Sequence, residues 1–451
     1  MGATEDLARF IVETPAERIP QAVLHEGKRC FINYLSVALY AARDPSLDIL
    51  LDVFKAEGGV RHASVIGAGT HTNLQNAALA NGYLGHLEDY DDTHFPTVIH
   101  PSSPTLPAAL AVGESIGASG RDVLTASVLG MEGCCRVGMA IHPYHYDEGW
   151  HITGTCGVFG AVGAAGRLAG LDTPRMVHAL GVAGTQAAGV REVFGSMTKP
   201  FHPGRSAQSG ILASLLAQRG FTSTTAILEG RRGFAAVYSS KSDLSRVADG
   251  IGERWELHMN GLKPYACGVV NHPLIDAMIA MRSRPGVTPQ AVERVTAKVH
   301  HLVLELVNRQ HPQVGLEGKF SYHHSMAVGL VDGSAFPAQY TDAKVKDPVI
   351  TALRDRINAT ADPSLSEDQA EVTLTLKDGR SYTERVAHAT GAPENPMTDA
   401  QLETKFRNLT RDVLPQAQAE ELLARLWALE QVADIREIVA LTRMRRRTHR
   451  K

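Results

Sequence analysis

The stretch RIPQAVLHEGKRCFINYLSVALYAA at residues 18–42 carries the pattern that decides the fold of this chain. Its apolar residues recur at three- and four-residue spacing, which is the period of one face of an α-helix. Pro20 stands near the start, where a helix tolerates proline because the first turn has no intrahelical partner for its backbone N–H groups. The stretch therefore predicts a long amphipathic helix.

The same helical pattern continues to about residue 260, and strand-like runs are scarce there. The stretches 124–141, 157–170 and 206–220 are rich in Gly and Ala rather than Leu. Small side chains let helix backbones approach each other closely, so we expect these segments to be central helices buried on most of their surface.

The character of the sequence changes near residue 261. Residues 292–307 are rich in β-branched side chains, and residues 370–388 alternate around Asp378-Gly379, a dipeptide typical of hairpin turns. A proline-rich segment at 391–401 then leads into amphipathic helical sequence. We predict a mainly α fold, a large all-helical domain with a smaller inserted α+β lid domain: helical 1–261, lid 262–392 and helical return 393–451.

Composition excludes several classes of function. The 451 residues hold 45 Lys and Arg against 48 Asp and Glu, a net charge of −3, so no overall field attracts nucleic acid or an anionic membrane. The basic run at 441–451 is typical of a solvated tail. We expect neither a nucleic-acid partner nor a membrane.

The five cysteines form no C-x-x-C pair, which argues against a disulfide framework and a thiolate zinc site. Glu5 and Asp6 stand where a signal peptide would be basic. These features predict a cytoplasmic protein in a reducing compartment.

Three short stretches, punctuated by Pro and Gly, concentrate the residues that can do chemistry. They read HLEDYDDTHFPTVIHPSS at 86–103, IHPYHYDEGWHITGT at 141–155 and TKPFHPGRSAQSG at 198–210. Histidines and carboxylates supply acids and bases, and cations bind anions, so their joint occurrence predicts one active site.

Helical geometry suggests how the first stretch is arranged. If residues 84–93 are helical, the side chains of His86, Asp89 and Thr93 fall on one face and can point into a common cleft. His100 precedes a proline in a constrained loop, which can bring its imidazole back over the same cleft.

The third stretch brings cations together. Lys199 precedes a proline, and His202 and Arg205 follow closely. We expect these three side chains to form a compact cationic group suited to a carboxylate or a phosphate.

Cofactor and metal motifs are weak. GVFGAVGAAGRLAG at 157–170 lacks the preceding strand and the later acidic residue of a dinucleotide fingerprint. DYDDTH at 89–94 is similar to an aspartate-rich Mg²⁺ helix, but a facing metal motif is missing. The histidines and carboxylates of 142–151 match no zinc signature, although they remain an alternative transition-metal set. We predict no metal and no cofactor.

Five motifs then point to a family. The chain resembles the MmgE/PrpD family in these motifs: NGYLGHLEDYDDT with HPSS, GWHITGTCGVFGA, TKPFHPGRSAQSG, KPYACGVVNHPLIDA and LEGKFSYHHSMAVGLVDG. That family includes 2-methylcitrate dehydratases, cis-aconitate decarboxylases and iminodisuccinate epimerases. The resemblance covers nearly the whole chain. It implies a helical domain, a late-inserted α+β lid, a homodimer and a metal-free pocket for a polycarboxylate.

The resemblance also implies the site residues. Matched motif by motif, they are Asp89, Thr93, His100, His151, Lys199 and His272, with His324 where the family pattern leads us to expect a tyrosine.

Roles for these residues follow from the chemistry that the family members share, a carbanion or enediolate next to a carboxylate. We expect Lys199, with His272, to bind a substrate carboxylate. His151 and His100 are the candidates for proton transfer. Asp89 would orient a histidine or act as a base, and Thr93 would donate a hydrogen bond.

The resemblance implies a cofactor-independent lyase or isomerase that acts on a small di- or tricarboxylate, similar to 2-methylcitrate dehydratase or aconitate decarboxylase. Two alternatives stay open. One is an isomerase similar to the iminodisuccinate epimerases. The other is a family member without turnover that serves as a binding or scaffold protein.

Overall fold

The computed structural model describes residues 2–444, so the basic run predicted to be a solvated tail lies largely outside the described residues. The chain forms two compact units. Unit 1 comprises Met1–Leu87, Asp91–Asn260 and Thr398–Lys451, and unit 2 comprises Glu88–Tyr90 and Gly261–Met397.

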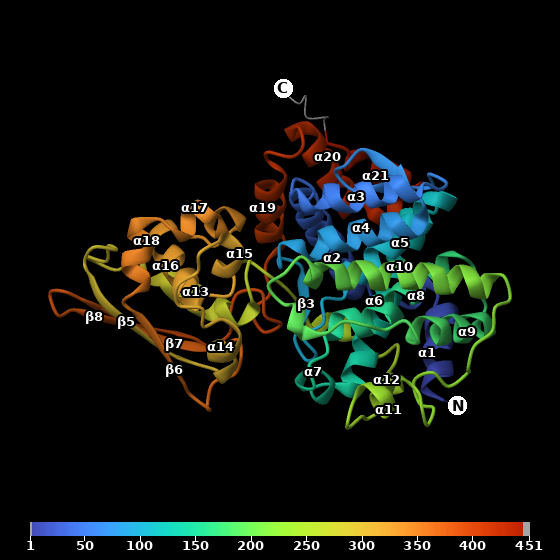
Figure 1. The fold of residues 1–451 in the computed structure, drawn as a ribbon, viewed down its shortest axis with the longest axis horizontal. Helices are drawn as coiled ribbons and strands as arrows, with labels where there is room; N and C mark the ends of the chain where they lie inside the picture. Colours follow the sequence, from blue (N-terminus) through green and yellow to red (C-terminus); the bar gives the residue numbers. More distant parts are fainter. Residues whose placement is uncertain (1, 445–451) are drawn as a thin grey trace. The chain divides into compact units, whose positions relative to one another are not determined.

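Unit 1 is mainly helical, and the short strands that it also contains show that it is not the all-helical domain predicted from the sequence (Figure 1). Its helices are α1 (Ala3–Glu13), α2 (Gln21–Ala41), α3 (Ser46–Glu57), α4 (Leu74–Leu87), α5 (Ser102–Ile116), α6 (Gly120–Ile141), α7 (Tyr144–Asp147), α8 (Ile152–Leu168), α9 (Thr173–Gly184), α10 (Thr198–Gln218), α11 (Phe234–Tyr238), α12 (Ser245–Ala248), α19 (Asp399–Thr410), α20 (Gln416–Trp427) and α21 (Arg436–Leu441). Short 3-10 turns lie at η1 (Ala16–Arg18), η2 (Arg191–Val193), η3 (Glu256–Met259) and η6 (Leu429–Gln431), and short strands at β1 (Ala63–Val65), β2 (Thr70–Thr72) and β3 (Asp92–His94).

The helix predicted from residues 18–42 is confirmed as α2, and Pro20 is its N-cap residue. The Gly- and Ala-rich stretches are also confirmed as buried central helices, since they lie on α6, α8 and α10. Helix α8 packs against α5, α6 and α10. Among the described residues, α6 has the length and hydropathy that a membrane span requires, but 94% of its most apolar window is buried inside the structure, as in a core helix.

Glycine sets the spacing of these helices. A Cβ atom at Gly82 of α4 would lie 2.7 Å from Cα of Gly204 on α10, and one at Gly210 would lie 2.5 Å from Cβ of Ala161 on α8. Real Cβ atoms do not approach other atoms so closely, so only glycine permits these backbones to cross at this distance.

Unit 2 combines one sheet with helices. The strands β5 (Val292–Val299), β6 (Ile357–Ala361), β7 (Ala370–Leu376) and β8 (Ser381–Val386) lie in the order β6-β5-β7-β8, with β5 and β6 parallel and the other pairs antiparallel. Its helices are α13 (His272–Met281), α14 (His301–Leu306), α15 (Gly315–Gly318), α16 (Tyr322–Asp332), α17 (Asp342–Val345) and α18 (Pro348–Arg354), with η4 (Val269–Asn271) and η5 (Pro337–Tyr340); β4 (Asn260–Leu262) lies where the chain passes from unit 1 into unit 2.

The sheet of unit 2 buries one face. Burial along β7 alternates residue by residue, and α13 packs against β7 and β8 and also against α16 (Figure 1). Strand β8 exposes every second side chain, as expected for an antiparallel edge with one solvated face.

The predicted hairpin is confirmed. Strands β7 and β8 pair in register with Thr375 opposite Ser381, and the chain turns at Asp378-Gly379. Gly379 has φ of 87°, a backbone conformation that glycine adopts without steric cost. Residues 292–307 contain the β-strand β5 and then the short helix α14.

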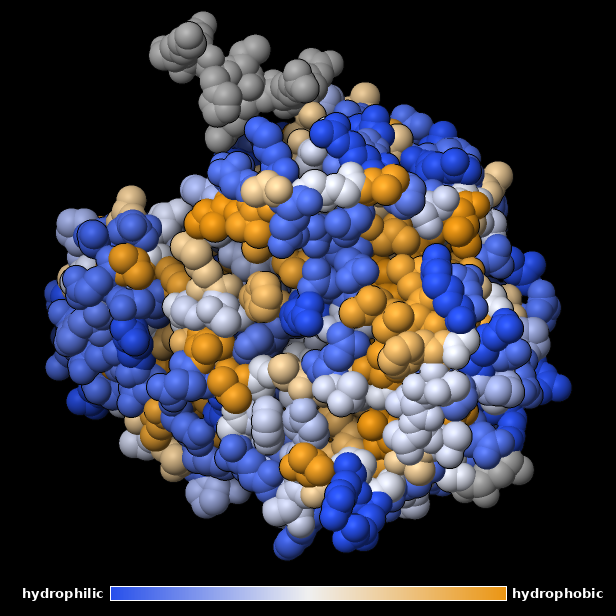
Figure 2. Space-filling model, turned by 45° about the vertical axis from the view of Figure 1, so that its right-hand side comes forward, coloured by the Kyte–Doolittle hydropathy of each residue, from blue (hydrophilic) through white to orange (hydrophobic). Residues whose placement is uncertain are grey.

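The surface carries no dominant apolar region on the face drawn in Figure 2, where hydrophobic side chains form interrupted patches among hydrophilic ones. Scattered exposed apolar side chains are normal for a folded protein, so this face alone indicates no docking surface.

The contact at Gly210 generates a prediction about stability. Replacing Gly210 by Ala adds up to about 1 kcal/mol of helix propensity but forces a methyl group against Ala161, and such overpacking costs about 1–3 kcal/mol. We therefore expect Gly210→Ala to destabilise the protein, as measured by the urea midpoint of unfolding. Gln218→Ala, at the exposed end of the same helix, is the control. A midpoint for Gly210→Ala at or above that of the wild type would contradict close packing there.

Candidate active site

The site begins with two adjacent carboxylates, Asp91 and Asp92, whose side chains contact the first residues of α5. Oδ2 of Asp91 accepts a hydrogen bond from the hydroxyl of Ser103 at 2.6 Å, and Oδ2 of Asp92 accepts one from the hydroxyl of Ser102 at 2.6 Å. All four residues are fully buried. The N-terminus of a helix favours nearby negative charge, so α5 and its two serines compensate much of the cost of burying this pair.

The two carboxylates face different neighbours. Asp92 also accepts a hydrogen bond from Nδ2 of Asn260 at 2.7 Å, whose amide contacts Sγ of Cys30 at 3.4 Å. Burial, together with the neighbouring charge of Asp91, raises the pKa of Asp92 to about 6. Asp92 thus ties distant segments of unit 1 together.

Asp91 faces a histidine. Nδ1 of His86, in the last turn of α4, lies 2.8 Å from Oδ2 of Asp91. Oδ1 of the same carboxylate lies 3.6 Å from Nδ1 of His100. Asp91 therefore sits between two imidazoles.

The prediction that residues 84–93 form one helix is wrong. Helix α4 ends at Leu87, Asp89 adopts a left-handed backbone with φ of 53°, and residues 92–94 form β3. The cause lies in the following carboxylates, which can reach Ser102 and Ser103 only if the chain leaves the helix. Aspartate tolerates the left-handed conformation better than most residues, which allows the turn.

The imidazole of His100 is held in one tautomer. Its Nδ1 lies 2.7 Å from the backbone oxygen of Asp92, and because a carbonyl can only accept, Nδ1 carries the proton. Nε2 is then the nitrogen with the lone pair. The hydroxyl of Thr93 lies 3.3 Å from Nδ1, and Thr153 accepts the backbone N–H of His100 at 3.1 Å.

His151 and His202 form a second pair. His151 is the N-cap residue of α8, and its Nδ1 lies 2.9 Å from Nδ1 of His202 on α10. Its ring stacks on that of His86 at 5.7 Å, while the rings of His86 and His100 are 4.6 Å apart. These four imidazoles, of His86, His100, His151 and His202, are named here the histidine cluster.

Burial keeps the second pair neutral. It lowers the pKa of His151 well below the ordinary value, with further lowering by nearby His86 and Lys199. Burial also lowers the pKa of His202 to about 4, again helped by His86 and Lys199. Both imidazoles are therefore uncharged near neutral pH and can accept protons.

Lys199 supplies a positive charge beside the cluster. It lies in the first turn of α10, is 9% exposed, and its ammonium stands 5.3 Å from the ring centroid of Phe194. The same ring contacts His151 edge-on at 5.0 Å. Phe194 therefore links the ammonium to the imidazoles.

The predicted cationic group of three side chains is wrong. His202 is neutral because of its burial, and Arg205 is exposed, with its guanidinium hydrogen-bonded to Gln208 at 2.5 Å. Of the three expected cations, Lys199 alone is both charged and buried next to the histidine cluster.

Three predicted residues belong to unit 2. The carboxylate of Asp89 pairs with Nζ of Lys263 at 3.0 Å. His272 starts α13 with its ring edge-on to Tyr265, and Nε2 of His324 donates to the backbone oxygen of Gln339 at 2.8 Å. The roles of these three residues remain predictions.

Some residues were missed by reasoning from sequence. His86 was noted only for its helical face, and Asp91 and Ser103 were not singled out. The signal was present in the motifs HLEDYDDT and HPSS, since buried carboxylates require hydroxyl or amide donors nearby. Lys263 stood in the quoted KPYACG motif without an assigned role.

Within residues 2–444, two groups of side chains are compact enough to hold a metal ion. The first is His86, Asp91 and His100, whose ligand atoms lie within 4.8 Å of one another. Hydrogen bonds account for that closeness, because Nδ1 of His100 already donates to a carbonyl. We therefore do not assign it as a metal site. The second is Asp368, His388 and Glu394 near the surface of unit 2.

The alternative metal set at 142–151 does not come together. His145 lies with its ring parallel to that of Trp150, and its Nδ1 donates to the backbone oxygen of Tyr238 at 2.6 Å. It is not among the compact groups found within the described part of the chain.

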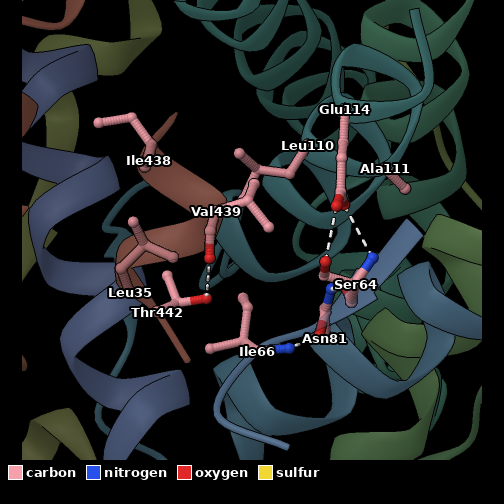
Figure 3. Close-up of a pocket in the computed structure, with 10 residues that line it drawn as sticks. All are labelled: Leu35, Ser64, Ile66, Asn81, Leu110, Ala111, Glu114, Ile438, Val439 and Thr442. Atoms are coloured by element: carbon pink, nitrogen blue, oxygen red, sulfur yellow. Dashed lines mark hydrogen bonds between the residues drawn. The ribbon is translucent and has the colours of Figure 1, made fainter. Parts of the chain in front are cut away.

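A small cavity elsewhere in unit 1 is not a substrate site. It has a volume of about 10 Å³, room for no more than a water molecule. Figure 3 shows Glu114 at its edge accepting hydrogen bonds from the backbone and hydroxyl of Ser64, while Asn81 binds the backbone of Ile66. These polar groups hold strand β1 in place.

The fold and the histidine cluster together define a mainly helical protein whose buried groups suit acid–base chemistry on an anion. The chain belongs to the MmgE/PrpD family, since the model of the MmgE/PrpD N-terminal domain matches residues 5–247 and that of the C-terminal domain matches residues 265–429.

Similar proteins carry names of enzymes. The cis-aconitate decarboxylase of Aspergillus terreus (strain NIH 2624 / FGSC A1156) is 26% identical over 475 residues, covering 98% of this chain and 96% of that protein. The cis-aconitate decarboxylase of Mus musculus is 28% identical over 460 residues, covering 98% and 93%. The 2-methylcitrate dehydratase of Escherichia coli (strain K12) is 26% identical over 111 residues, covering 22% and 23%.

The lowered pKa of His202 predicts a dependence of stability on pH. Between pH 6.5 and about 4 the unfolded chain binds a proton on this side chain that the folded chain does not, so stability falls as pH falls through this range. One such group contributes up to about 3 kcal/mol. We expect His202→Gln to lose less stability than the wild type between pH 6.5 and 4.5, as measured by urea unfolding. Gln208→Ala on the same helix is the control, and equal losses in all three proteins would contradict a neutral buried His202.

Proposed function

We propose that this chain is a lyase that acts on a small di- or tricarboxylate by proton transfer at a carbon next to a carboxylate. The observation that carries the proposal is the buried cluster in which the neutral imidazole of His151 and the ammonium of Lys199 both lie against the ring of Phe194. The full-length similarity to cis-aconitate decarboxylases supports the same class of reaction.

Both lyase reactions, decarboxylation and dehydration, require groups that donate and accept protons. In a decarboxylation the carbon–carbon bond to a carboxylate breaks, CO₂ leaves, and the electron pair spreads toward a neighbouring carboxylate. An imidazolium then gives its proton to carbon and recovers one from solvent. In a dehydration a base takes the proton from carbon, and the hydroxyl leaves as water after receiving a proton.

Each group of unit 1 has a role in this proposal. Lys199 binds a substrate carboxylate and stabilises the negative charge that develops in the transition state. His151 and His100 transfer protons, and Thr93 donates a hydrogen bond. Burial strengthens all these interactions because the local dielectric is low.

The proposal has further parts that rest on the family resemblance. Asp89 orients a histidine or acts as a base, and His272 and His324 bind the substrate. The enzyme works without a metal or redox cofactor, as a homodimer in the cytoplasm. Analytical ultracentrifugation tests the dimer directly.

The reaction type is tested by NMR in D₂O. Purified protein is incubated with cis-aconitate, 2-methylcitrate and iminodisuccinate, and the spectra follow loss of substrate, deuterium uptake and stereochemistry. Loss of CO₂ or of water supports the lyase, whereas inversion with deuterium uptake assigns an epimerase. Binding of these acids without turnover or exchange would favour a scaffold protein.

A first prediction separates binding from proton transfer. Because an ammonium holds a carboxylate in the ground state as well as the transition state, Lys199→Met should raise KM strongly and can lower kcat too. Lys241→Met is the matched control, since its ammonium also lies over an aromatic ring, that of Tyr144, but on an exposed part of unit 1. An unchanged KM in a folded Lys199→Met protein would remove this lysine from substrate binding.

A second prediction concerns His151. If it transfers a proton, His151→Gln should lower kcat by roughly 10²–10⁴-fold while KM changes much less. His178→Gln is the control, because that imidazole binds the backbone of Ser223 away from the cluster. Near-normal kcat in a folded His151→Gln protein would leave His100 or Asp89 as the proton carrier.

A third prediction tests the absence of a metal requirement. Activity should survive dialysis against a chelator, with no gain when a divalent ion is restored. Loss of activity that Zn²⁺ or Mg²⁺ reverses would overturn the metal-free mechanism and direct attention to His86, Asp91 and His100.

A further inference from the structure

We propose that His86 is a further proton-transfer residue of this site, with Nε2 as its working atom and with Asp91 and Ser103 as the groups that orient it. The inference rests on the proposed function, and it concerns a residue to which neither the family resemblance nor the similar proteins give a role.

The first step is the hydrogen-bond chain. Oδ2 of Asp91 accepts the hydroxyl of Ser103 at 2.6 Å and lies 2.8 Å from Nδ1 of His86. An ionised carboxylate can only accept, so Nδ1 of His86 carries the proton. The lone pair of the neutral imidazole is therefore on Nε2.

The second step is the state of that nitrogen. Nε2 of His86 is buried and has no hydrogen-bond partner among the described residues. Leaving a buried polar atom without a partner costs about 1–3 kcal/mol, so such an atom calls for a reason. A substrate group or a proton passed between neighbours would supply one.

The third step is the position of the ring. It lies 4.6 Å from the ring of His100 and stacks at 5.7 Å on that of His151, the two residues proposed to transfer protons. Its charged and titratable neighbours are Asp91, His100 before α5, His151 at the N-cap of α8, and His202 on α10. His86 is the member of the cluster that contacts both candidates.

A purely structural role for His86 does not account for its position among the other imidazoles. His94 is equally buried and its Nε2 also has no hydrogen-bond partner among the described residues, but that nitrogen faces the carboxylate of Glu256 at 3.4 Å. Its Nδ1 lies 2.7 Å from the hydroxyl of Thr97, and its ring lies outside the histidine cluster. His86 instead has a carboxylate on one nitrogen and no partner on the other, which is the arrangement by which a carboxylate orients a general base.

The test begins with a measurement that does not need activity. In protein labelled with ¹⁵N-histidine, the His86 resonances, assigned through the His86→Gln spectrum, should show that the neutral ring carries its proton on Nδ1 and not on Nε2. Asp91→Asn should shift the population toward the other tautomer, because the negative acceptor is gone. A wild-type His86 with its proton on Nε2 would overturn the proposal whatever the kinetics of the variants.

Kinetics with the acid that the NMR screen identifies then test the role. We expect His86→Gln to lower kcat by about 10²-fold or more with little change in KM. Asp91→Asn should also lower kcat, and Ser103→Ala should lower it by a smaller factor. His94→Gln is the matched control for loss of a buried imidazole and should keep kcat within a few-fold. If His86→Gln lowers kcat no more than His94→Gln does, the role is refuted.

The two proposals fail in different ways. A correct tautomer in a protein that turns over none of the acids would sink the proposed function and, with it, the kinetic role of His86. Turnover that persists in folded His86→Gln protein would sink only the role of His86.

Discussion

Two adjacent buried carboxylates, Asp91 and Asp92, impose the constraint on which the rest of unit 1 depends. Taking an ionised carboxylate out of water costs several kcal/mol unless hydrogen-bond donors replace the solvent. The donors are the hydroxyls of Ser102 and Ser103 at the N-terminus of α5. To reach them the chain must leave α4 after Leu87 and turn through the left-handed backbone of Asp89.

The two carboxylates have different neighbours and therefore different effects on the structure. Asp92 accepts a hydrogen bond from Asn260, whose amide contacts Cys30, and burial together with the charge of Asp91 raises its pKa to about 6. Asp91 faces the imidazoles of His86 and His100. Asp92 thus holds segments of unit 1 together, whereas Asp91 orients the imidazoles of the histidine cluster.

Sequence reasoning recovers what is local. The period of apolar residues predicts α2, and the dipeptide Asp378-Gly379 predicts the β7–β8 hairpin, because both patterns act over a few neighbouring residues. The same reasoning extends α4 too far, since the partners that pull the chain out of the helix lie 10 and 12 residues beyond the carboxylates. The charge of a side chain is likewise not predictable from local sequence alone. His202 reads as a cation in TKPFHPGR, but its burial, which makes it neutral, depends on α8 and is invisible in a linear motif.

Burial also explains why the proposed site for an anion holds neutral histidines. Before a ligand binds, the low dielectric and the ammonium of Lys199 both disfavour a second positive charge, so His151 and His202 stay unprotonated. A di- or tricarboxylate reverses that balance, because its negative charges favour the imidazolium form. Binding of the proposed substrate would thus draw a proton into the histidine cluster, and a decarboxylation consumes one proton for each CO₂ released. The substrate itself would therefore supply the charge that protonates the cluster, and the desolvation that lowers the pKa values of His151 and His202 would make that proton easier to transfer.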